Sequence, residues 1–204
     1  MSTKIKICGL TRAQDIQTAN ALQLDYIGFV FTPKSKRFVA PEQAKQLRRQ
    51  LAPGIQAVGV FVNAPPEQIA ALLVDGTIDI AQLHGQEDAA YIARLRSLTH
   101  TPIWQAFRIE NTEDISRANA SPADLVLLDH GAGGTGERFD WTLLHGMARP
   151  FVLAGGLTPQ NAAEAIAQAR PYAVDTSSGC ETNGVKDPAK MLAFVNAVRN
   201  TITD

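Results

Sequence analysis

The sequence has few cysteines and no long apolar run, and these two absences narrow the class of protein. Only Cys8 and Cys180 are present among 204 residues, which argues against a disulfide framework. No stretch approaches the roughly 20 apolar residues that a membrane-spanning helix requires. The amino-terminal residues MSTKIKICGL lack the apolar segment and cleavage site of a signal peptide. We therefore expect a cytoplasmic protein without a membrane partner.

An excess of charge of one sign is also missing. The formal net charge is −1, from 19 Lys and Arg against 20 Asp and Glu. Without a net basic charge the chain lacks the electrostatic field that holds nucleic acid, so we expect no nucleic-acid partner.

The length suffices for one domain with its own hydrophobic core and is short for two. We expect residues 1–204 to form a single domain.

Short apolar runs alternate along the chain with segments of helical periodicity. Runs such as VLLD and FVLA are apolar on successive residues, which is typical of parallel strands buried on both faces. The predicted strands are Lys4–Cys8, Tyr26–Phe31, Gln56–Val62, Ile78–Leu83, Ile103–Arg108, Leu125–Asp129, Phe151–Ala154 and Tyr172–Asp175.

Capping residues predict where several of the intervening helices begin. Thr11 and Gln14 have the spacing of a capping box. A short helix is expected after Trp141. Proline favours the first helical position, and the prolines that fit it are Pro41, Pro159 and Pro188, with Thr158 and Asp187 as the preceding caps of the last two.

Eight alternating units fit either a closed barrel or an open, doubly wound sheet. The count favours the barrel. No G-x-G-x-x-G turn follows the first predicted strand, where an open dinucleotide-binding sheet needs one. We therefore predict an α/β fold, a (β/α)8 TIM barrel with a closed, parallel eight-stranded sheet. In this fold the functional residues lie at the carboxyl ends of the strands and in the loops that follow.

Two residues that end predicted strands are candidates for acid–base chemistry. Cys8 could act as a base if a nearby positive charge lowers its thiol pKa from about 8.5, although buried cysteines often only pack. From the residue alone packing is the better interpretation, but the position of Cys8 at the carboxyl end of a predicted strand, followed by a loop that begins with Gly9, makes the two interpretations comparable. Asp129 closes an apolar run, where a carboxyl group is costly unless it is solvated or paired. A Gly-rich segment follows it, which favours a general acid over a helix cap.

Polar residues after two other strands are candidates for substrate binding. Arg37 lies in a basic segment with Lys34 and Lys36. Such segments are usually solvated, but a guanidinium at a barrel mouth could bind a substrate carboxylate through two hydrogen bonds. Gln82 and His84 occur in AQLHG. No His, Cys or acidic partner stands at metal-ligand spacing, so we interpret both as polar wall residues and expect no metal.

Two Gly-rich turns follow the last two predicted strands. AGGLTP contains Gly155 and Gly156, and DTSSGCETNG contains Ser178 and Gly179. Backbone N–H groups of such turns often bind phosphate in this fold. Glycines also occur simply to make turns, but two such turns on neighbouring strands favour a phosphate site.

Taken in order, these segments resemble the phosphoribosylanthranilate isomerase family of tryptophan biosynthesis. The resemblance covers nearly the whole chain, and the combination of segments is specific although no single one is. The matching segments are KICGLT at 6–11, GFVFTPKSKR at 28–37, VGVFVN at 58–63, AQLHG at 81–85, LLD at 127–129, GGTGERFDW at 133–141, AGGLTP at 154–159 and VDTSSGCE at 174–181.

The resemblance implies an Amadori rearrangement of N-(5-phosphoribosyl)anthranilate, an aminoaldose, to 1-(2-carboxyphenylamino)-1-deoxyribulose 5-phosphate. It implies that Cys8 is the general base, that Asp129 is the general acid, and that Arg37 faces the anthranilate. The loops after the seventh and eighth strands would hold the phosphate. The nitrogen of the substrate serves as the electron sink, so no cofactor is expected. The expected partner is this small molecule, and the chain is expected to be a monomer or a homodimer.

Three other functions compete with this prediction. The related histidine-pathway isomerase performs the same rearrangement on a bisphosphate, but would carry aspartate in place of Cys8 and a second phosphate-binding turn. A metal-dependent sugar-phosphate epimerase would lose activity with strong chelators. A non-catalytic phosphosugar-binding barrel would have no need for both Cys8 and Asp129.

Overall fold

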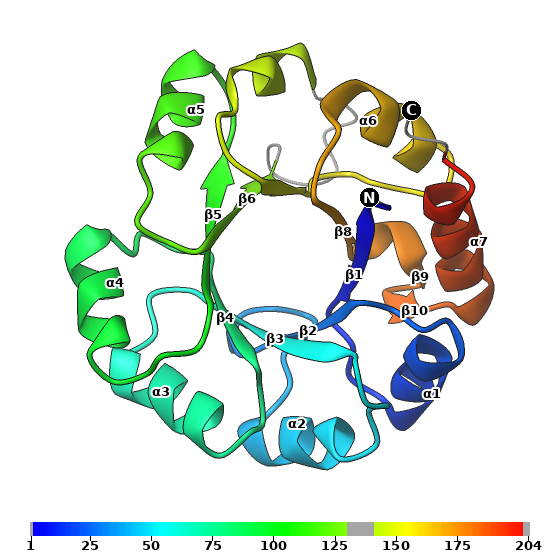
Figure 1. Cartoon of the computed structure of the whole chain (residues 1–204). Coiled ribbons are helices and arrows are strands. Elements are labelled where there is room, and N and C mark those ends of the chain that lie inside the picture. Colours follow the sequence, from blue (N-terminus) through cyan, green and yellow to red (C-terminus); the bar gives the residue numbers. More distant parts are fainter. Residues whose placement is uncertain (1, 130–140, 202–204) are drawn as a thin grey trace.

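The computed structural model describes residues 2–129 and 141–201. Eight parallel strands pair in chain order, and the eighth pairs with the first to close a barrel. Figure 1 looks along this barrel and shows the helices as a ring around it. The predicted (β/α)8 barrel is therefore confirmed. Of the segment at 133–141, only Trp141 lies within the described residues.

All of the predicted strands are present, and their ends differ from the predictions by at most two residues. At β2, β3, β4 and β7 apolar residues continue beyond the ladder, whereas β8 begins and ends one residue later than predicted. The strands are β1 (Lys4–Cys8), β2 (Tyr26–Val30), β3 (Gln56–Phe61), β4 (Ile80–Leu83), β5 (Ile103–Arg108), β6 (Leu125–Asp129), β7 (Phe151–Leu153) and β8 (Ala173–Thr176).

Helices follow most of the strands and cover the outside of the barrel (Figure 1). A short antiparallel hairpin of β9 (Glu181–Thr182) and β10 (Val185–Lys186), which the sequence did not predict, precedes the last helix. Within the described residues, no helix has the length and apolar content to cross a membrane. The helices are α1 (Ala13–Ala21), α2 (Pro41–Arg48), α3 (Pro66–Val74), α4 (Ala89–Arg96), α5 (Thr112–Asn119), α6 (Ala162–Ala169) and α7 (Pro188–Arg199), with 3-10 helices η1 (Trp141–Gly146) and η2 (Ser178–Cys180).

Two of the predicted helix starts are confirmed. Pro41 begins α2 and Pro188 begins α7. The Asp187 carboxylate accepts hydrogen bonds from the backbone N–H groups of Ala189 and Lys190, as expected of a helix cap. The short helix after Trp141 is also present, as η1.

The predicted capping box of Thr11 and Gln14 is wrong. Helix α1 begins at Ala13, and Asp15 Oδ2 accepts from the backbone N–H groups of Thr11 and Arg12, each at 3.0 Å. An ionised carboxylate is a stronger acceptor than the amide oxygen of Gln14 in the predicted box, and the Arg12 guanidinium lies 2.6 Å from Asp15 Oδ1 and balances its charge. The acidic residue therefore determines where this helix begins.

The predicted start of α6 at Pro159 is also wrong. The helix begins at Ala162, three residues later. Asn161 Oδ1 accepts from the backbone N–H of Thr158, and Asn161 Nδ2 donates to the carbonyl of Gly156. These hydrogen bonds close a turn over the residues that the predicted first turn of the helix would have used.

The hydrophobic core has two parts, because successive side chains of a strand point to opposite faces. One face packs against the helices, as Ile5 and Ile7 of β1 do. The other face fills the barrel, where the ring of Tyr26 meets that of Trp104 edge-on, with centroids 5.1 Å apart. The apolar cluster inside the barrel comprises Tyr26, Val58, Ile80, Trp104, Leu125, Leu127, Val152, Ala154 and Ala173.

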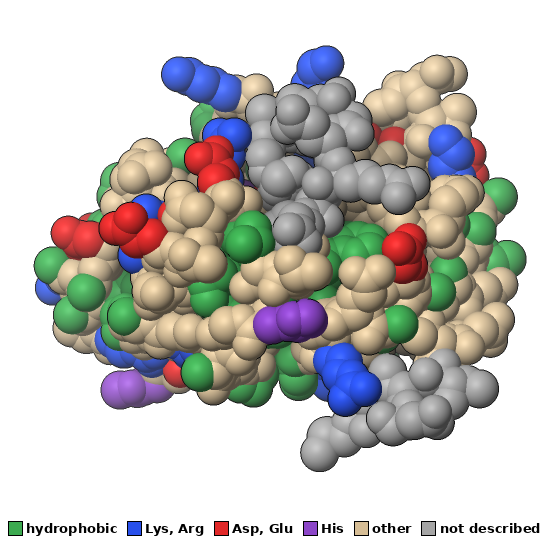
Figure 2. All heavy atoms as spheres, turned by 90° about the horizontal axis from the view of Figure 1, so that it is seen from above, with side chains coloured by type: hydrophobic (Ala, Val, Ile, Leu, Met, Phe, Trp, Pro, Cys, Tyr) green, Lys and Arg blue, Asp and Glu red, His purple; other side chains and the backbone are tan. Residues whose placement is uncertain are grey.

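The outer surface mixes side chains of both charges. Figure 2 views the molecule at right angles to Figure 1, and on this face basic and acidic side chains are interspersed with apolar ones. This mixture agrees with the net charge of −1.

Candidate active site

A cavity of about 260 Å³ lies at the carboxyl ends of the strands, where functional sites of this fold are found. All of the predicted site residues except Gly179 line it. They come from β1, β4 and β6 and from the loops after β2, β4, β7 and β8, so barrel closure brings residues distant in the chain to one place. They are Cys8, Arg37, Gln82, His84, Asp129, Gly155, Gly156 and Ser178.

Cys8 ends β1 and lies almost fully buried at the base of this cavity. It pairs with Gly28 of the neighbouring strand β2. A Cβ atom at residue 28 would lie 2.6 Å from Cys8 Sγ, closer than real Cβ contacts allow. Gly28 therefore leaves the space that the thiol occupies, a contribution that sequence reasoning missed.

Opposing effects act on the Cys8 thiol. Burial is the largest and raises its pKa above the ordinary value of 9.0. The positive charges of Lys6 and Lys186 lower the pKa but do not cancel the effect of burial. The thiol is thus protonated at neutral pH in the free protein, and a thiolate needs local positive charge to form.

Asp129 ends β6 on another side of the cavity, where it contacts one predicted wall residue, which in turn contacts the other. His84 Nε2 lies 3.5 Å from Asp129 Oδ2. Gln82 Nε2 lies 3.3 Å from His84 Nδ1. The polar wall residues therefore orient the carboxyl group.

Arg37 reaches across to the loop that follows β8. Its Nε and Nη2 donate to the two carboxylate oxygens of Glu181 at 2.6 and 2.8 Å. Lys186 Nζ also contacts Glu181 and donates to the backbone oxygen of Ser177. Burial by itself would raise the pKa of Glu181, but the hydrogen bonds from Arg37 and Lys186 bring it below its ordinary value. Sequence reasoning identified Arg37 but missed its partner.

The Gly-rich turns form one wall of the cavity. Gly155 has φ +86° and Gly156 has φ +64°, a left-handed backbone that favours glycine. A Cβ atom at residue 156 would meet no other atom within 4 Å, so it would enter open space. At residue 179 a Cβ atom would lie 2.0 Å from the carbonyl oxygen of Leu157. Gly179 therefore lets the two turns approach each other and does not face the cavity.

Sequence reasoning missed a second acidic residue at a strand end. Asp175 of β8 lines the cavity, and its Oδ2 accepts from Lys6 Nζ at 2.9 Å. The rule that selected Asp129 could have selected Asp175, because both follow apolar residues at the ends of strands. The buried Lys6 stands two residues before Cys8, and period-two alternation places it on the same face of β1.

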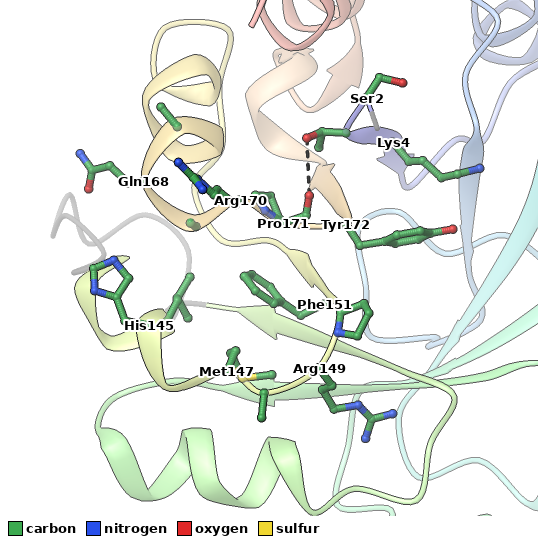
Figure 3. A pocket seen from close by; sticks show the side chains of 16 residues that line it. Ser2, Lys4, His145, Met147, Arg149, Phe151, Gln168, Arg170, Pro171 and Tyr172 are labelled. Atoms are coloured by element: carbon green, nitrogen blue, oxygen red, sulfur yellow. Dashed lines mark hydrogen bonds between the residues drawn. The ribbon is translucent and has the colours of Figure 1, made fainter. Parts of the chain in front are cut away.

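Two further cavities differ in their relation to this site. One of about 460 Å³ shares His84 and Asp129 and extends towards Phe107, so it continues the site along the barrel mouth. A larger one of about 890 Å³ opens at the amino ends of the strands, between η1 and α6. Figure 3 shows His145, Phe151 and Arg170 around it. It contains none of the predicted site residues and lies away from the mouth.

The side chains that could ligate a metal ion do not cluster in the part of the chain that the structure describes. Among the described residues, no group of three or more His, Cys, Asp or Glu side chains is arranged to hold a metal ion. The His84 ring is instead engaged between Gln82 and Asp129.

Comparison with known proteins places the chain in a family. The model of the N-(5'phosphoribosyl)anthranilate (PRA) isomerase family matches residues 5–197. The chain belongs to this family. The resemblance stated from the sequence segments is thereby confirmed, and with it the enzyme class, an isomerase of tryptophan biosynthesis. Membership favours this activity over the three alternatives weighed from the sequence.

Individual relatives match over almost the whole chain. The N-(5'-phosphoribosyl)anthranilate isomerase of Caldanaerobacter subterraneus subsp. tengcongensis is 44% identical, and the alignment covers 98% of this chain and 99% of the relative. The crystal structure of phosphoribosyl anthranilate isomerase from Thermotoga maritima has a TM-score of 0.89 at 35% identity, covering 97% and 98% of the two chains. A structure of a phosphoribosyl anthranilate isomerase with reduced 1-(o-carboxyphenylamino)-1-deoxyribulose 5-phosphate bound has a TM-score of 0.86 at 35% identity, with the same coverage.

Proposed function

We propose that this chain catalyses the Amadori rearrangement of N-(5-phosphoribosyl)anthranilate to 1-(2-carboxyphenylamino)-1-deoxyribulose 5-phosphate by general acid–base catalysis. The observation that carries the proposal is that one cavity brings together Cys8, Asp129 and the Gly-rich turns in a chain of this family. An acid, a base and an anion-binding wall are the groups that this reaction needs.

Asp129 is the proposed general acid. In the first step its carboxyl proton passes to the furanose ring oxygen while the bond between this oxygen and C1 breaks. The substrate nitrogen donates its electron pair to C1, which gives a protonated Schiff base and an open chain. The Asp129 side chain is 29% exposed, so it can reach a ligand in the cavity. The contact from His84 keeps it directed there.

Cys8 is the proposed general base. In the second step its thiolate removes the proton from C2, and the electron pair of the C–H bond moves towards the nitrogen to give an enolamine. Tautomerisation of the enolamine then yields the ketose. Strands β1 and β6 lie three positions apart in the closed barrel. The acid and the base therefore approach the sugar from separate sides, as two different target atoms require.

The phosphate and the anthranilate carboxylate are the proposed anchors of the substrate. The backbone around Gly155, Gly156 and Ser178 offers N–H donors to the phosphate, with Gly179 supporting the turns. Arg37 faces the anthranilate. Among the described residues its Nη1 takes part in no hydrogen bond, which leaves this nitrogen to donate to the substrate.

We propose that the reaction uses no cofactor, because the substrate nitrogen supplies the electron sink. We further propose that the enzyme acts in the cytoplasm on a free small molecule, either as a monomer or as a homodimer.

A steady-state assay with both aminoaldoses tests the proposal. We expect the fluorescence of the anthranilate substrate to be consumed, and activity to survive strong chelators. Consumption of the histidine-pathway substrate alone would replace the proposed reaction. Binding of the anthranilate substrate without turnover would support the non-catalytic phosphosugar-binding barrel, and loss of activity with chelators would support a metal-dependent enzyme.

A further inference from the structure

A lysine lies inside the barrel, where the other side chains are mostly apolar. The Lys6 side chain is 0% exposed. The apolar cluster inside the barrel includes Val58, Leu127 and Val152. Removing an ammonium group from water costs several kcal/mol unless an opposite charge and hydrogen bonds compensate. Asp175 Oδ2, 2.9 Å from Lys6 Nζ, provides that compensation.

The stability of the fold alone does not explain why a Lys6–Asp175 ion pair is buried here. A buried ion pair is often no more stabilising than well-packed apolar residues of similar volume. The location of the pair is more informative. Asp175 lines the cavity, and its second oxygen, Oδ1, is buried without a hydrogen-bond partner among the described residues. The pair therefore lies at the boundary between the apolar interior and the reacting groups.

Lys6 also interacts directly with Cys8. The two residues share one face of β1, and the Lys6 ammonium, 2.9 Å from Asp175 Oδ2, attracts the thiolate form of Cys8 through its charge. Burial disfavours the ammonium, but the attraction of Asp175 and Cys8 is larger, and the pKa of Lys6 is raised. Lys6 thus carries its positive charge at neutral pH on the face of β1 that also bears the Cys8 thiol.

We propose that Lys6, held as an ammonium by Asp175, is a positioning residue that supplies the countercharge of the Cys8 thiolate during proton abstraction. This inference rests on the proposed role of Cys8 as the base. The attraction of Lys6 for the thiolate exceeds the repulsion from Asp175. Asp175 is needed nevertheless, because an unpaired buried lysine tends to lose its proton.

Other charged groups around the cavity act on the same residues. Lys186 lowers the pKa of the Cys8 thiol, and Arg37 interacts with it through charge. Burial raises the pKa of Asp175, Lys6 opposes this rise, and Asp129 and His84 act on Asp175 from β6 and from the residues after β4. Lys6 has the largest effect of any charged group on Cys8. Removing Lys6 should therefore raise the pKa of the Cys8 thiol more than removing any other cation would.

The test is the titration of Cys8 in the full chain. In a Cys180→Ala background Cys8 is the only thiol. The rate of alkylation by iodoacetamide is measured against pH, with and without Lys6→Met. In Lys6→Met we expect the inflection of the alkylation rate profile to move to higher pH by about one unit or more. One unit corresponds to about 1.4 kcal/mol of interaction between the two protonation states. We expect kcat to fall at least about tenfold with little change in KM.

Lys4→Met is the matched control. Lys4 is on the same face of β1, two residues earlier, and pairs with Asp25 at a partly exposed position. This variant loses the same charge from the same strand, so we expect the thiol inflection and kcat to remain as in the parent protein.

A second variant covers the case in which Lys6→Met fails to fold because Asp175 is left unpaired. Lys6→Met with Asp175→Asn removes both charges, and the inflection should still move to higher pH because the attraction from Lys6 is the larger of the two. An unchanged inflection in a folded variant would overturn the proposal. The alkylation assay needs no turnover, so it remains informative if Cys8→Ala proves active and the proposed catalytic role of Cys8 fails.

Discussion

Glu181 binds Arg37 through both of its carboxylate oxygens, at 2.6 Å from Nε and 2.8 Å from Nη2. Arg37 follows β2 and Glu181 begins β9, so this ion pair joins two loops at the mouth of the barrel. The guanidinium is planar, and a two-point contact on one edge fixes the direction of the remaining nitrogen. Glu181 thus holds Arg37, the proposed substrate-binding arginine, in place before a ligand binds.

Replacing Arg37 should lower the affinity for the substrate more than it lowers the rate of the chemical steps. We expect Arg37→Ala to raise KM at least about tenfold, the scale of a lost charge-assisted hydrogen bond, with a smaller effect on kcat. Arg94→Ala is the control, because Arg94 forms an exposed ion pair with Glu67 on the helical surface. Steady-state kinetics measure both variants. An unchanged KM in Arg37→Ala would remove Arg37 from the binding site.

The lowered pKa of Glu181 predicts an acid-dependent part of stability. A carboxyl group whose pKa is depressed by folding stabilises the protein above its unfolded pKa, near the ordinary 4.5, and this stabilisation is lost as pH falls through the lower folded value. The free energy of unfolding of the parent protein should therefore decrease as pH falls below about 4.5. Glu181→Gln should show a shallower decrease in denaturant titrations. Parallel pH profiles would contradict the prediction.

The two proposed catalytic residues should each be needed for turnover. We expect Cys8→Ala and Asp129→Asn to lower kcat at least roughly 10²-fold, the scale of a lost acid or base. Circular dichroism and thermal melting would verify that both variants fold. Cys180→Ala is the matched control for Cys8, because Cys180 is a buried thiol that does not line the cavity. Turnover close to the parent value in either catalytic variant would disprove that assignment.

A methyl group at Gly156 should interfere with phosphate binding. Gly156→Ala projects a Cβ into open space at the cavity wall, and we expect KM to rise at least about tenfold if phosphate occupies that space. Gly184→Ala is a close control, since Gly184 also has positive φ and free space but lies in the β9–β10 connection. Each variant should pay roughly 1–2 kcal/mol for the left-handed backbone. Equal KM values in the two variants would place the phosphate elsewhere.

The sequence by itself determined the order of the barrel strands and the location of the proposed catalytic residues. Apolar runs gave the strands because both faces of each strand are covered, and the count of eight indicated closure. Cys8 and Asp129 were identified because polar residues at the carboxyl ends of such strands must face the mouth. The starts of α2 and α7 followed from proline at the first helical position, since its fixed φ suits a helix and its missing N–H costs nothing there.

Only the tertiary structure decided which charges meet. Lys6 and Asp175 are 169 residues apart, and they pair because closure of the barrel places β8 beside β1. Arg37 and Glu181 are 144 residues apart and meet where two loops fold over the mouth. The starts of α1 and α6 depended on which of several nearby acceptors had the better geometry. Periodicity along one strand shows that a side chain points inward, whereas its partner depends on which strands become neighbours.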